Sequence, residues 1–288
     1  MTYPLDPSEL LAAGHERIAI QVAYNGRNYH GWQCQKDVVS VQQKLEQALS
    51  VVADSPIKVV CAGRTDAGVH ASGQIVHFDS PNIRPMRAWT HGGNAKLPDD
   101  IAIQWAQPVP ESFHARFSAT ARQYRYVIYN HAMRPALMDK EVTWNYRPLQ
   151  VHAMQKAAAC LVGEHDFTSF RASGCQANSP IRRIHQLQVI RAGSYIVLDV
   201  RANAFLHHMI RNFAGLLMEI GSGNRPPEWA NEVLKARDRR QSAATAAPYG
   251  LYFVGAEYGE HFNLPKTDLG PHFLQPWMAA DSFTKPVL

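Results

Sequence analysis

The segment at residues 61–74 concentrates charged and small residues between two apolar stretches that have the character of strands. Within it, Gly63 and Gly68 flank Arg64 and Asp66, and glycine permits sharp turns and the close approach of a ligand. A carboxylate with a reference pKa of about 3.9 is ionised at neutral pH, so it can attack an electrophilic carbon without a base to activate it. We therefore expect the chemistry of this chain at Asp66, with Arg64 as a fixed cation two residues away.

The same stretch also suits a plain tight turn, because Gly, Asp and Thr are ordinary turn residues. In that interpretation Asp66 caps backbone amides and Arg64 is solvated. Residue types alone leave both interpretations open, so the elements around the loop and its wider sequence context have to be considered.

The first part of the chain predicts the element order β-α-β-β-α-β. Apolar residues alternate over 17–24, which indicates a half-buried strand. Ser40 is a typical N-cap, and Val41, Leu45 and Leu49 form an apolar helical stripe after it. The other expected elements are strands at 57–61, 74–79 and 101–106 and a short helix at 84–91.

A similar order recurs after a proline-containing connector at 107–119. The pattern predicts strands at 122–129, 185–191, 195–200 and 251–258 and helices at 149–161, 205–220 and 227–236. Residues 131–147 are expected to form a surface loop, and residues 259–288 a tail to which we assign no function. We predict an α+β protein of two α/β sandwich halves, residues 1–112 and 113–288.

The composition is that of a globular protein, with 46% hydrophobic and 18% charged residues in a chain long enough for two domains. No apolar run reaches the roughly 18 residues of a membrane-spanning helix, and the N-terminus, with Asp6, Glu9 and Glu16, does not resemble a secretory signal. We therefore expect a cytoplasmic location and no membrane partner. The formal charge of +5 is compatible with a nucleic-acid partner without demonstrating one.

The four cysteines are far apart and form no C-x-x-C pair, so reduced thiols are expected rather than a zinc ribbon or a disulfide framework. The chain also lacks a phosphate-binding P-loop, an H-E-x-x-H motif and a Rossmann fingerprint. We expect no metal, nucleotide or redox cofactor. The cysteines are Cys34, Cys61, Cys160 and Cys175.

Several motifs together resemble the TruA-type tRNA pseudouridine synthases. Gly-Arg-Thr-Asp-Ala-Gly-Val-His-Ala at 63–71 is similar to the signature of that family, and residues 24–33 resemble its Tyr-x-Gly-x-x-Tyr-x-Gly-Trp-Gln segment. Phe-Leu-His-His-Met-Ile-Arg at 205–211 resembles its Phe-Leu-x-x-Met-Val-Arg motif. The resemblance runs from about residue 18 to residue 258. Tyr249 stands where the family usually has a second proline, which concerns only the local loop.

The resemblance implies roles for four residues. Asp66 is the catalytic aspartate, Arg64 helps to hold the target base out of its stack, Tyr124 of the Arg-x-Tyr-x-Tyr segment lies beside the target uridine, and Arg211 pairs with Asp66. Without the resemblance, Tyr124 is an ordinary sheet residue and Arg211 a surface cation. Whether Asp66 attacks the sugar carbon, attacks the ring or removes a proton is left open. Arg171, Arg182 and Arg183 are further candidates for phosphate contacts.

The resemblance also implies a fold, a substrate and an assembly. The expected fold has two ferredoxin-like or RRM-like halves whose antiparallel sheets meet under a basic central cleft. The expected reaction converts uridines 38, 39 and 40, on the 3′ side of the tRNA anticodon stem-loop, to pseudouridine. A homodimer is expected.

Two other classes of function compete with this interpretation. A non-catalytic RNA-binding protein of paired RNA-recognition-like domains is disfavoured, because the aromatic RNP1 consensus is absent. A metal hydrolase is disfavoured because His207 and His208 are adjacent rather than one helical turn apart, while His70 and His77 lack a recognisable partner ligand.

Overall fold

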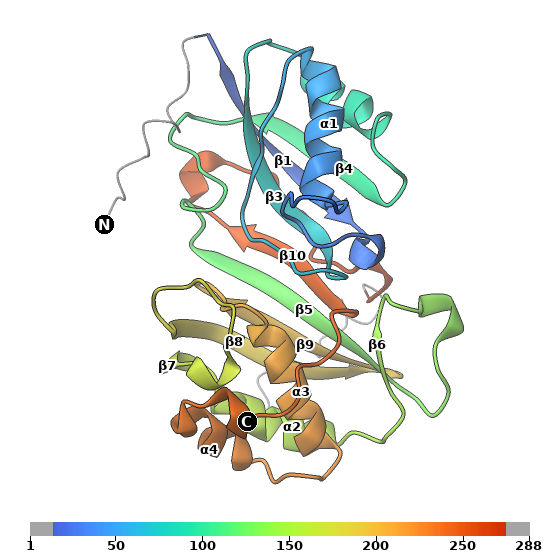
Figure 1. Cartoon of the computed structure of the whole chain (residues 1–288), viewed down its shortest axis with the longest axis vertical. Helices are drawn as coiled ribbons and strands as arrows, with labels where there is room; N and C mark the ends of the chain where they lie inside the picture. The colour runs from blue at the N-terminus through green and yellow to red at the C-terminus, as the bar shows by residue number, and fades with distance from the viewer. Residues whose placement is uncertain (1–13, 275–288) are drawn as a thin grey trace.

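A computed structural model of the chain describes residues 14–274. Asp6 and Glu9 and the last part of the tail, 275–288, lie outside the described residues, as do the outer ends of the two predicted halves. Within the described range the protein has the predicted α+β class. Its strands form one continuous mixed sheet of ten strands that runs through the molecule (Figure 1). None of the helices in this range is both long enough and apolar enough to span a bilayer.

The N-terminal part follows the predicted order of strands and helix. The helix begins where expected, because the Ser40 side chain accepts a hydrogen bond from the Gln43 backbone N–H (3.3 Å). In the sheet, β4 pairs with β1, β1 with β3, and β2 with β3. The elements are β1 (Glu16–Tyr24), α1 (Val41–Ala53), β2 (Val60–Cys61), β3 (His70–Ser80) and β4 (Ile101–Pro108).

The C-terminal part places its strands in the order β5-β9-β8-β7, with β6 pairing on β5. Figure 1 shows its helices gathered beside these strands. The elements are β5 (Ala121–Asn130), β6 (Thr143–Asn145), α2 (Val151–Ala159), β7 (Gly163–Asp166), β8 (Ile181–Ala192), β9 (Tyr195–Ala202), α3 (Met209–Gly221), α4 (Trp229–Ala236) and β10 (Leu251–Glu257).

The last strand, β10, joins the two parts of the sheet. It runs parallel to β3, with Phe253 opposite Ala71, and antiparallel to β5, with Phe253 opposite Tyr124. The start of β3 immediately follows the loop that carries Asp66. β10 therefore brings the Asp66 loop and the Tyr124 strand together, although they are far apart in sequence.

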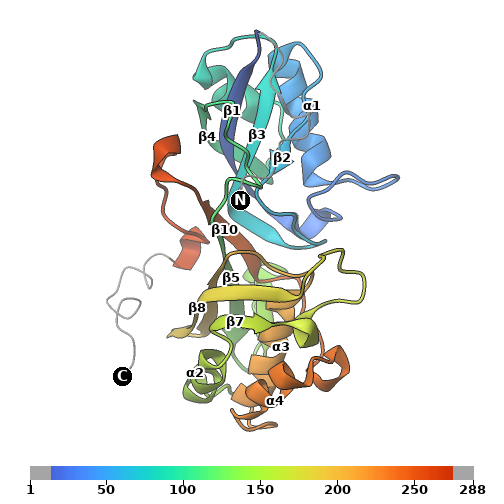
Figure 2. The ribbon, with the colours of Figure 1, turned by 90° about the vertical axis from the view of Figure 1, so that its left-hand side faces the viewer.

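The two faces of the sheet near β5 are covered by different parts of the chain. Tyr124 and Tyr126 pack in the large core that also contains the buried side of α3. Val127, from the alternate face of the strand, packs in a smaller cluster with Leu274 at the end of the described tail. Figure 2 shows this C-terminal segment on the side of the sheet away from α3. The tail up to residue 274 thus closes the second face.

Four predicted elements differ from the structure. The helix expected at 205–220 begins only at Met209, because His208 adopts a left-handed conformation (φ 62°) that ends the helical run on its N-terminal side. The helix at 84–91 is a π-helix at Ala88–Gly92, and the strand at 57–61 is reduced to β2. The loop at 131–147 contains β6, and β7 was not predicted.

Candidate active site

Asp66 lies on the loop between β2 and β3, and this loop is clamped by the glycine-rich segment at 24–33. The Trp32 N–H donates to the Thr65 carbonyl (3.0 Å), and the Tyr24 hydroxyl bonds to the Thr65 side chain (2.8 Å). On the other side of Asp66, the Gly68 N–H donates to the Tyr29 carbonyl (3.3 Å). Because backbone groups on both sides of Asp66 are bonded, the carboxylate is presented in a fixed direction.

The clamp depends on two glycines that allow the backbones to touch. A Cβ atom on Gly31 would lie 2.6 Å from the Thr65 carbonyl oxygen, and one on Gly26 would lie 1.9 Å from the Val69 carbonyl oxygen. Both distances are shorter than any real Cβ contact. Both glycines of the segment at 24–33 therefore serve its contact with the Asp66 loop.

The Asp66 carboxylate is paired with an arginine from the C-terminal part of the chain. The Arg211 Nη1 atom lies 3.3 Å from Asp66 Oδ2, across 145 positions of sequence, and Arg211 Nε donates to the Ala246 carbonyl (2.9 Å). The second bond fixes the guanidinium. The Asp66 side chain is 27% exposed and that of Arg211 is 14% exposed, so a substrate in solution can reach the carboxylate.

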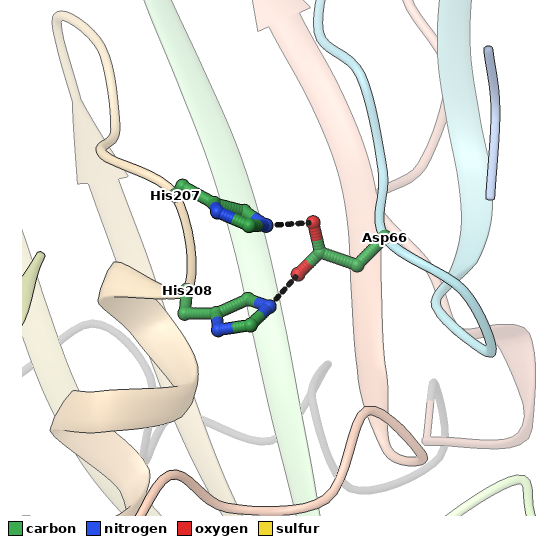
Figure 3. A group of neighbouring side chains, drawn as sticks. All are labelled: Asp66, His207 and His208. Carbon is green, nitrogen blue, oxygen red and sulfur yellow. Dashed lines mark ion pairs between the residues drawn. The ribbon is translucent and has the colours of Figure 1, made fainter. Parts of the chain in front are cut away.

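Two adjacent histidines face the same carboxylate (Figure 3). His207 Nε2 lies 3.3 Å from Asp66 Oδ1, and His208 Nε2 lies 3.4 Å from Asp66 Oδ2. Burial is the largest influence on the pKa of His208 and lowers it, against the opposing attraction of the carboxylate. Although the two histidines are adjacent in sequence, both can face Asp66 because they precede α3, which begins at Met209.

Tyr124 lies in an aromatic wall beside the loop. Its side chain is only 8% exposed, and its ring packs edge-on against Phe205 (5.1 Å between centroids) and Phe253 (5.0 Å). A Cβ atom on Gly63 would lie 3.4 Å from the Tyr124 hydroxyl oxygen, so the phenol adjoins the start of the Asp66 loop. Burial raises the pKa of Tyr124 above its usual value and keeps the phenol neutral. Within residues 14–274 its hydroxyl has no hydrogen-bond partner.

Comparison with known proteins gives a consistent result. The family model described as tRNA pseudouridine synthase matches residues 20–118 and 157–259, which is more than half of the chain. The chain belongs to the tRNA pseudouridine synthase family. The tRNA pseudouridine synthase A of Pseudomonas aeruginosa is 58% identical over 272 residues, covering 94% of this chain and 95% of the relative.

Further relatives agree. The tRNA pseudouridine synthase A of Shewanella amazonensis is 57% identical over 258 residues, covering 90% of this chain and 99% of the relative. Among solved structures, an archaeal box H/ACA sRNP Nop10–Cbf5 complex is similar at 11% identity and a TM-score of 0.31, over 70% of this chain and 44% of that one, which is too distant to support a conclusion. The chain is thus an isomerase that acts on uridine in tRNA.

Within this tRNA pseudouridine synthase, the candidate residues named from sequence fall into two groups. Asp66, Arg211 and Tyr124 converge where the two parts of the sheet join. Arg64 does not contact the carboxylate: its side chain is exposed and forms no hydrogen bond or ion pair with the described residues. Arg64 is thus an exposed cation on the loop that does not hold Asp66.

The arginines considered as phosphate contacts also differ from one another. Arg171 donates to the carbonyls of Cys175 and Ala177, and Arg182 donates to those of Ser179 and Ile181, so both guanidinium groups hold backbone. Arg183 is exposed. In this synthase it is the member of the group that is most exposed to solvent.

Sequence reasoning missed the contribution of the two histidines and of the aromatic wall. The wall unites Phe205 and Phe253, and only the position of β10 between β3 and β5 brings them to Tyr124. The one signal in the sequence for the histidines was their place within the same short motif as Arg211.

Proposed function

We propose that this enzyme converts uridines on the 3′ side of the tRNA anticodon stem-loop to pseudouridine, with Asp66 as the nucleophile. The observation that supports this most directly is the geometry of Asp66. Its carboxylate is partly exposed on a clamped loop and is held by Arg211 from the opposite part of the chain. The choice of stem-loop rests on the resemblance of the sequence motifs.

The reaction rearranges one nucleoside without a net gain or loss of atoms. The bond between uracil N1 and ribose C1′ breaks, the base turns, and a bond forms between C5 and C1′. The hydrogen of C5 leaves as a proton and N1 gains one. Asp66 attacks as the ionised carboxylate and is released unchanged, so no cofactor has to supply electrons or a transferred group.

The target base has to leave its stack to reach the carboxylate, which costs a few kcal/mol. Tyr124 is suited to offset part of this cost, since stacking a base on an aromatic side chain contributes about 1–3 kcal/mol. Its neutral hydroxyl has no partner in the described structure and is available to the base. Arg64, exposed on the same loop, would meet the nearby phosphate or the orphaned partner base.

A surface depression adjoins the loop on the side of Ala67 and Gly68. It has a volume of about 320 Å³, and its walls include Arg27, His30 and Tyr249. The Lys140 ammonium lies 5.8 Å from the centre of the Tyr249 ring. An aromatic face between cationic groups suits a nucleotide next to the target, so we assign this depression to the flanking RNA.

The substitution Asp66→Asn tests the central assignment. We expect product formation to fall by at least about 10⁴-fold, because the amide cannot act as a nucleophile. The affinity for tRNA should stay close to that of the wild type, since the amide keeps the size of the side chain. Tritium release from tRNA labelled at uridine C5 measures turnover, and filter binding measures affinity.

Asp54→Asn is the matched control, because Asp54 is exposed at the C-terminal end of α1, outside the Asp66 loop. Turnover by Asp66→Asn that equals turnover by this control would refute the assignment. For the substrate, an isolated anticodon stem-loop hairpin is expected to be modified, whereas moving its uridines to the 5′ side should abolish modification. Modification of both hairpins would remove the proposed specificity and leave the role of Asp66 intact.

We also propose that the enzyme is a homodimer. Support comes from the loop before and around β6, which exposes large apolar side chains to solvent: Met133, Leu137, Trp144 and Tyr146. Light scattering should give twice the mass of one chain, and Leu137→Arg should shift the protein towards the monomer. A wild-type mass equal to that of one chain would rule the dimer out.

A further inference from the structure

The side chains around Asp66 have a geometry that the isomerase reaction does not require. Figure 3 shows the two histidine rings directing a nitrogen atom each at the two oxygens of one carboxylate. One ligand atom each from Asp66, His207 and His208 lies within 4.8 Å of the others. For the proposed reaction, one cation is enough to hold the carboxylate in its ionised form and in a fixed direction. Arg211 already supplies that cation.

The two histidines converge because the backbone at His208 adopts a conformation that is uncommon for non-glycine residues. His208 has φ 62° and ψ 5°, in the left-handed region, immediately before α3. This conformation is unfavourable for a residue with a Cβ atom, because the Cβ crowds the following carbonyl oxygen. In a helix or a strand two adjacent side chains point in different directions, whereas here the ring centroids of His207 and His208 are 4.0 Å apart. Strained residues of this kind concentrate at functional sites.

The three side chains lie close enough together to ligate one cation. With zinc bonds of about 2.0–2.1 Å to nitrogen and oxygen, neighbouring ligand atoms are about 3.3–3.4 Å apart. His207 Nε2 lies 3.3 Å from Asp66 Oδ1 and His208 Nε2 lies 3.4 Å from Asp66 Oδ2, so each nitrogen is at such a distance from one of the two carboxylate oxygens. A small cation between the three side chains could therefore contact all of them.

The donor set is also that of a known kind of metal site. Two neutral imidazole nitrogens and one carboxylate oxygen are ligands that Zn²⁺ accepts, and three protein ligands leave a fourth position open to water. Nearby Arg211 contacts Asp66 Oδ2 at 3.3 Å. Its positive charge opposes a metal ion, so binding should be weaker than in zinc enzymes and reversible by a chelator.

We propose that Asp66, His207 and His208 bind a tetrahedral divalent cation of the Zn²⁺ type, and that the bound ion inhibits the enzyme by occupying the Asp66 carboxylate. The binding site stands independently of the reaction mechanism. The inhibition rests on the proposed function of Asp66. The ion is an inhibitor here and takes no part in the isomerisation.

Binding is tested on the full-length, metal-free protein without tRNA. Co²⁺ serves as the probe, because tetrahedral Co²⁺ absorbs visible light far more strongly than octahedral Co²⁺, and Zn²⁺ is then titrated in to displace it. We expect one tetrahedral Co²⁺ per chain in the wild type. His207→Ala and His208→Ala should each weaken binding at least about 10-fold, since a lost ligand costs no less than a lost supporting residue.

Two control variants identify the origin of the signal. His152→Ala removes an exposed histidine on α2 and should bind Co²⁺ as the wild type does. Cys175→Ser removes a thiol whose Sγ accepts a hydrogen bond from the His207 N–H (3.4 Å), and it should also leave the tetrahedral signal in place. Circular dichroism in metal-free buffer checks that each variant is folded. Unchanged Co²⁺ binding in a folded His208→Ala variant would overturn the site.

Inhibition is measured separately with buffered free Zn²⁺ and C5-tritiated tRNA. Wild-type turnover should fall in proportion to the occupancy found in the binding titration and return when a chelator is added. The residual turnover of His208→Ala should not respond at the same Zn²⁺ concentrations, which excludes effects of Zn²⁺ on the tRNA itself. Full turnover by the wild type with the site occupied would overturn the inhibition. Failure of the nucleophile assignment would appear instead in Asp66→Asn without any metal.

Discussion

Two aspartate–arginine pairs occupy opposite faces of the same sheet. At the site, Arg211 makes one contact of 3.3 Å to Asp66, whose side chain is 27% exposed. On the other face, Arg125 Nε lies 3.0 Å from Asp199 Oδ2, with exposures of 6% and 3%. The second pair links neighbouring strands β5 and β9, whereas the first links two distant parts of the chain.

The pairs differ in how completely their polar atoms are satisfied. Asp199 also accepts a hydrogen bond from Gln123 (2.6 Å), and Arg125 also donates to the carbonyls of Leu269 and Gly270 (2.7 Å each). A buried ion pair whose polar atoms all have partners supports the fold. Removing one partner would leave the other charge uncompensated in a low-dielectric environment. The Asp66 carboxylate, in contrast, is partly exposed and has only contacts of 3.3–3.4 Å, so it remains accessible to a further partner.

The largest expected effect on stability comes from breaking the buried pair. Asp199→Asn leaves the Arg125 guanidinium without its counter-charge and should lower the free energy of unfolding by about 3–5 kcal/mol. Urea titration followed by circular dichroism measures this. Asp66→Asn, in the same assay, should change stability by less than about 1 kcal/mol, because a solvent-accessible ion pair contributes little to stability. Equal losses in the two variants would show that both pairs are structural.

A smaller effect, confined to catalysis, is expected from the exposed pair. Arg211→Ala removes the charge-assisted contact that fixes the direction of the carboxylate, a contact of about 1.5–3 kcal/mol, so kcat should fall roughly 10- to 100-fold with little change in KM. Added guanidinium should restore part of the rate, because it refills the vacated space next to Asp66.

Arg87→Ala is the control for this variant, since Arg87 is exposed and distant from Asp66. Its kcat should equal that of the wild type with and without guanidinium. A loss of rate in Arg211→Ala that guanidinium does not relieve, combined with a lower melting temperature, would mean that Arg211 supports the fold rather than the carboxylate.

The contrast also shows which parts of the molecule the sequence could predict. Local patterns were sufficient for α1, which begins after Ser40, and for the alternating strands, because periodicity and capping act over a few residues. They failed at 205–208, where the apolar helical spacing continues upstream of the helix. There tertiary contacts override it: the His207 N–H bonds to Cys175 and the His207 carbonyl accepts from Ala172.

The site was predictable only as far as family motifs reach. Asp66 and Arg211 were identified through such motifs, and no local rule brings together residues 145 positions apart. The role of β10 was not predictable, because a last strand can pair at either edge of a sheet. Its insertion between β3 and β5 is what supplies Phe253 to the wall around Tyr124. Likewise, the convergence of His207 and His208 depends on one left-handed residue.

The smallest of the expected effects distinguishes the histidines of the site from those of the core. His77 on β3 is buried, and its Nδ1 accepts a hydrogen bond from the Ala115 N–H (3.1 Å), which requires a neutral ring. Burial first, then the nearby His114 and Arg17, lower the pKa of His77 to about 3. In the unfolded chain the pKa returns to about 6.5.

The unfolded chain therefore binds a proton at His77 more readily than the native protein does. The stability that depends on neutral His77 is fully present above pH 6.5 and is lost as the pH falls towards 3. At pH 5.5 the loss should be about 1.4 kcal/mol relative to pH 8.

His77→Asn isolates this contribution, because an asparagine Oδ1 can accept the same hydrogen bond but does not titrate. Urea titrations at pH 8 and pH 5.5 should give a smaller difference for this variant than for the wild type, by about 1.4 kcal/mol. His152→Asn, on the exposed side of α2, should keep the wild-type difference. If His77→Asn also keeps the wild-type difference between pH 8 and pH 5.5, then His77 is already protonated at pH 5.5 in the native protein. In that case burial does not hold this core histidine neutral.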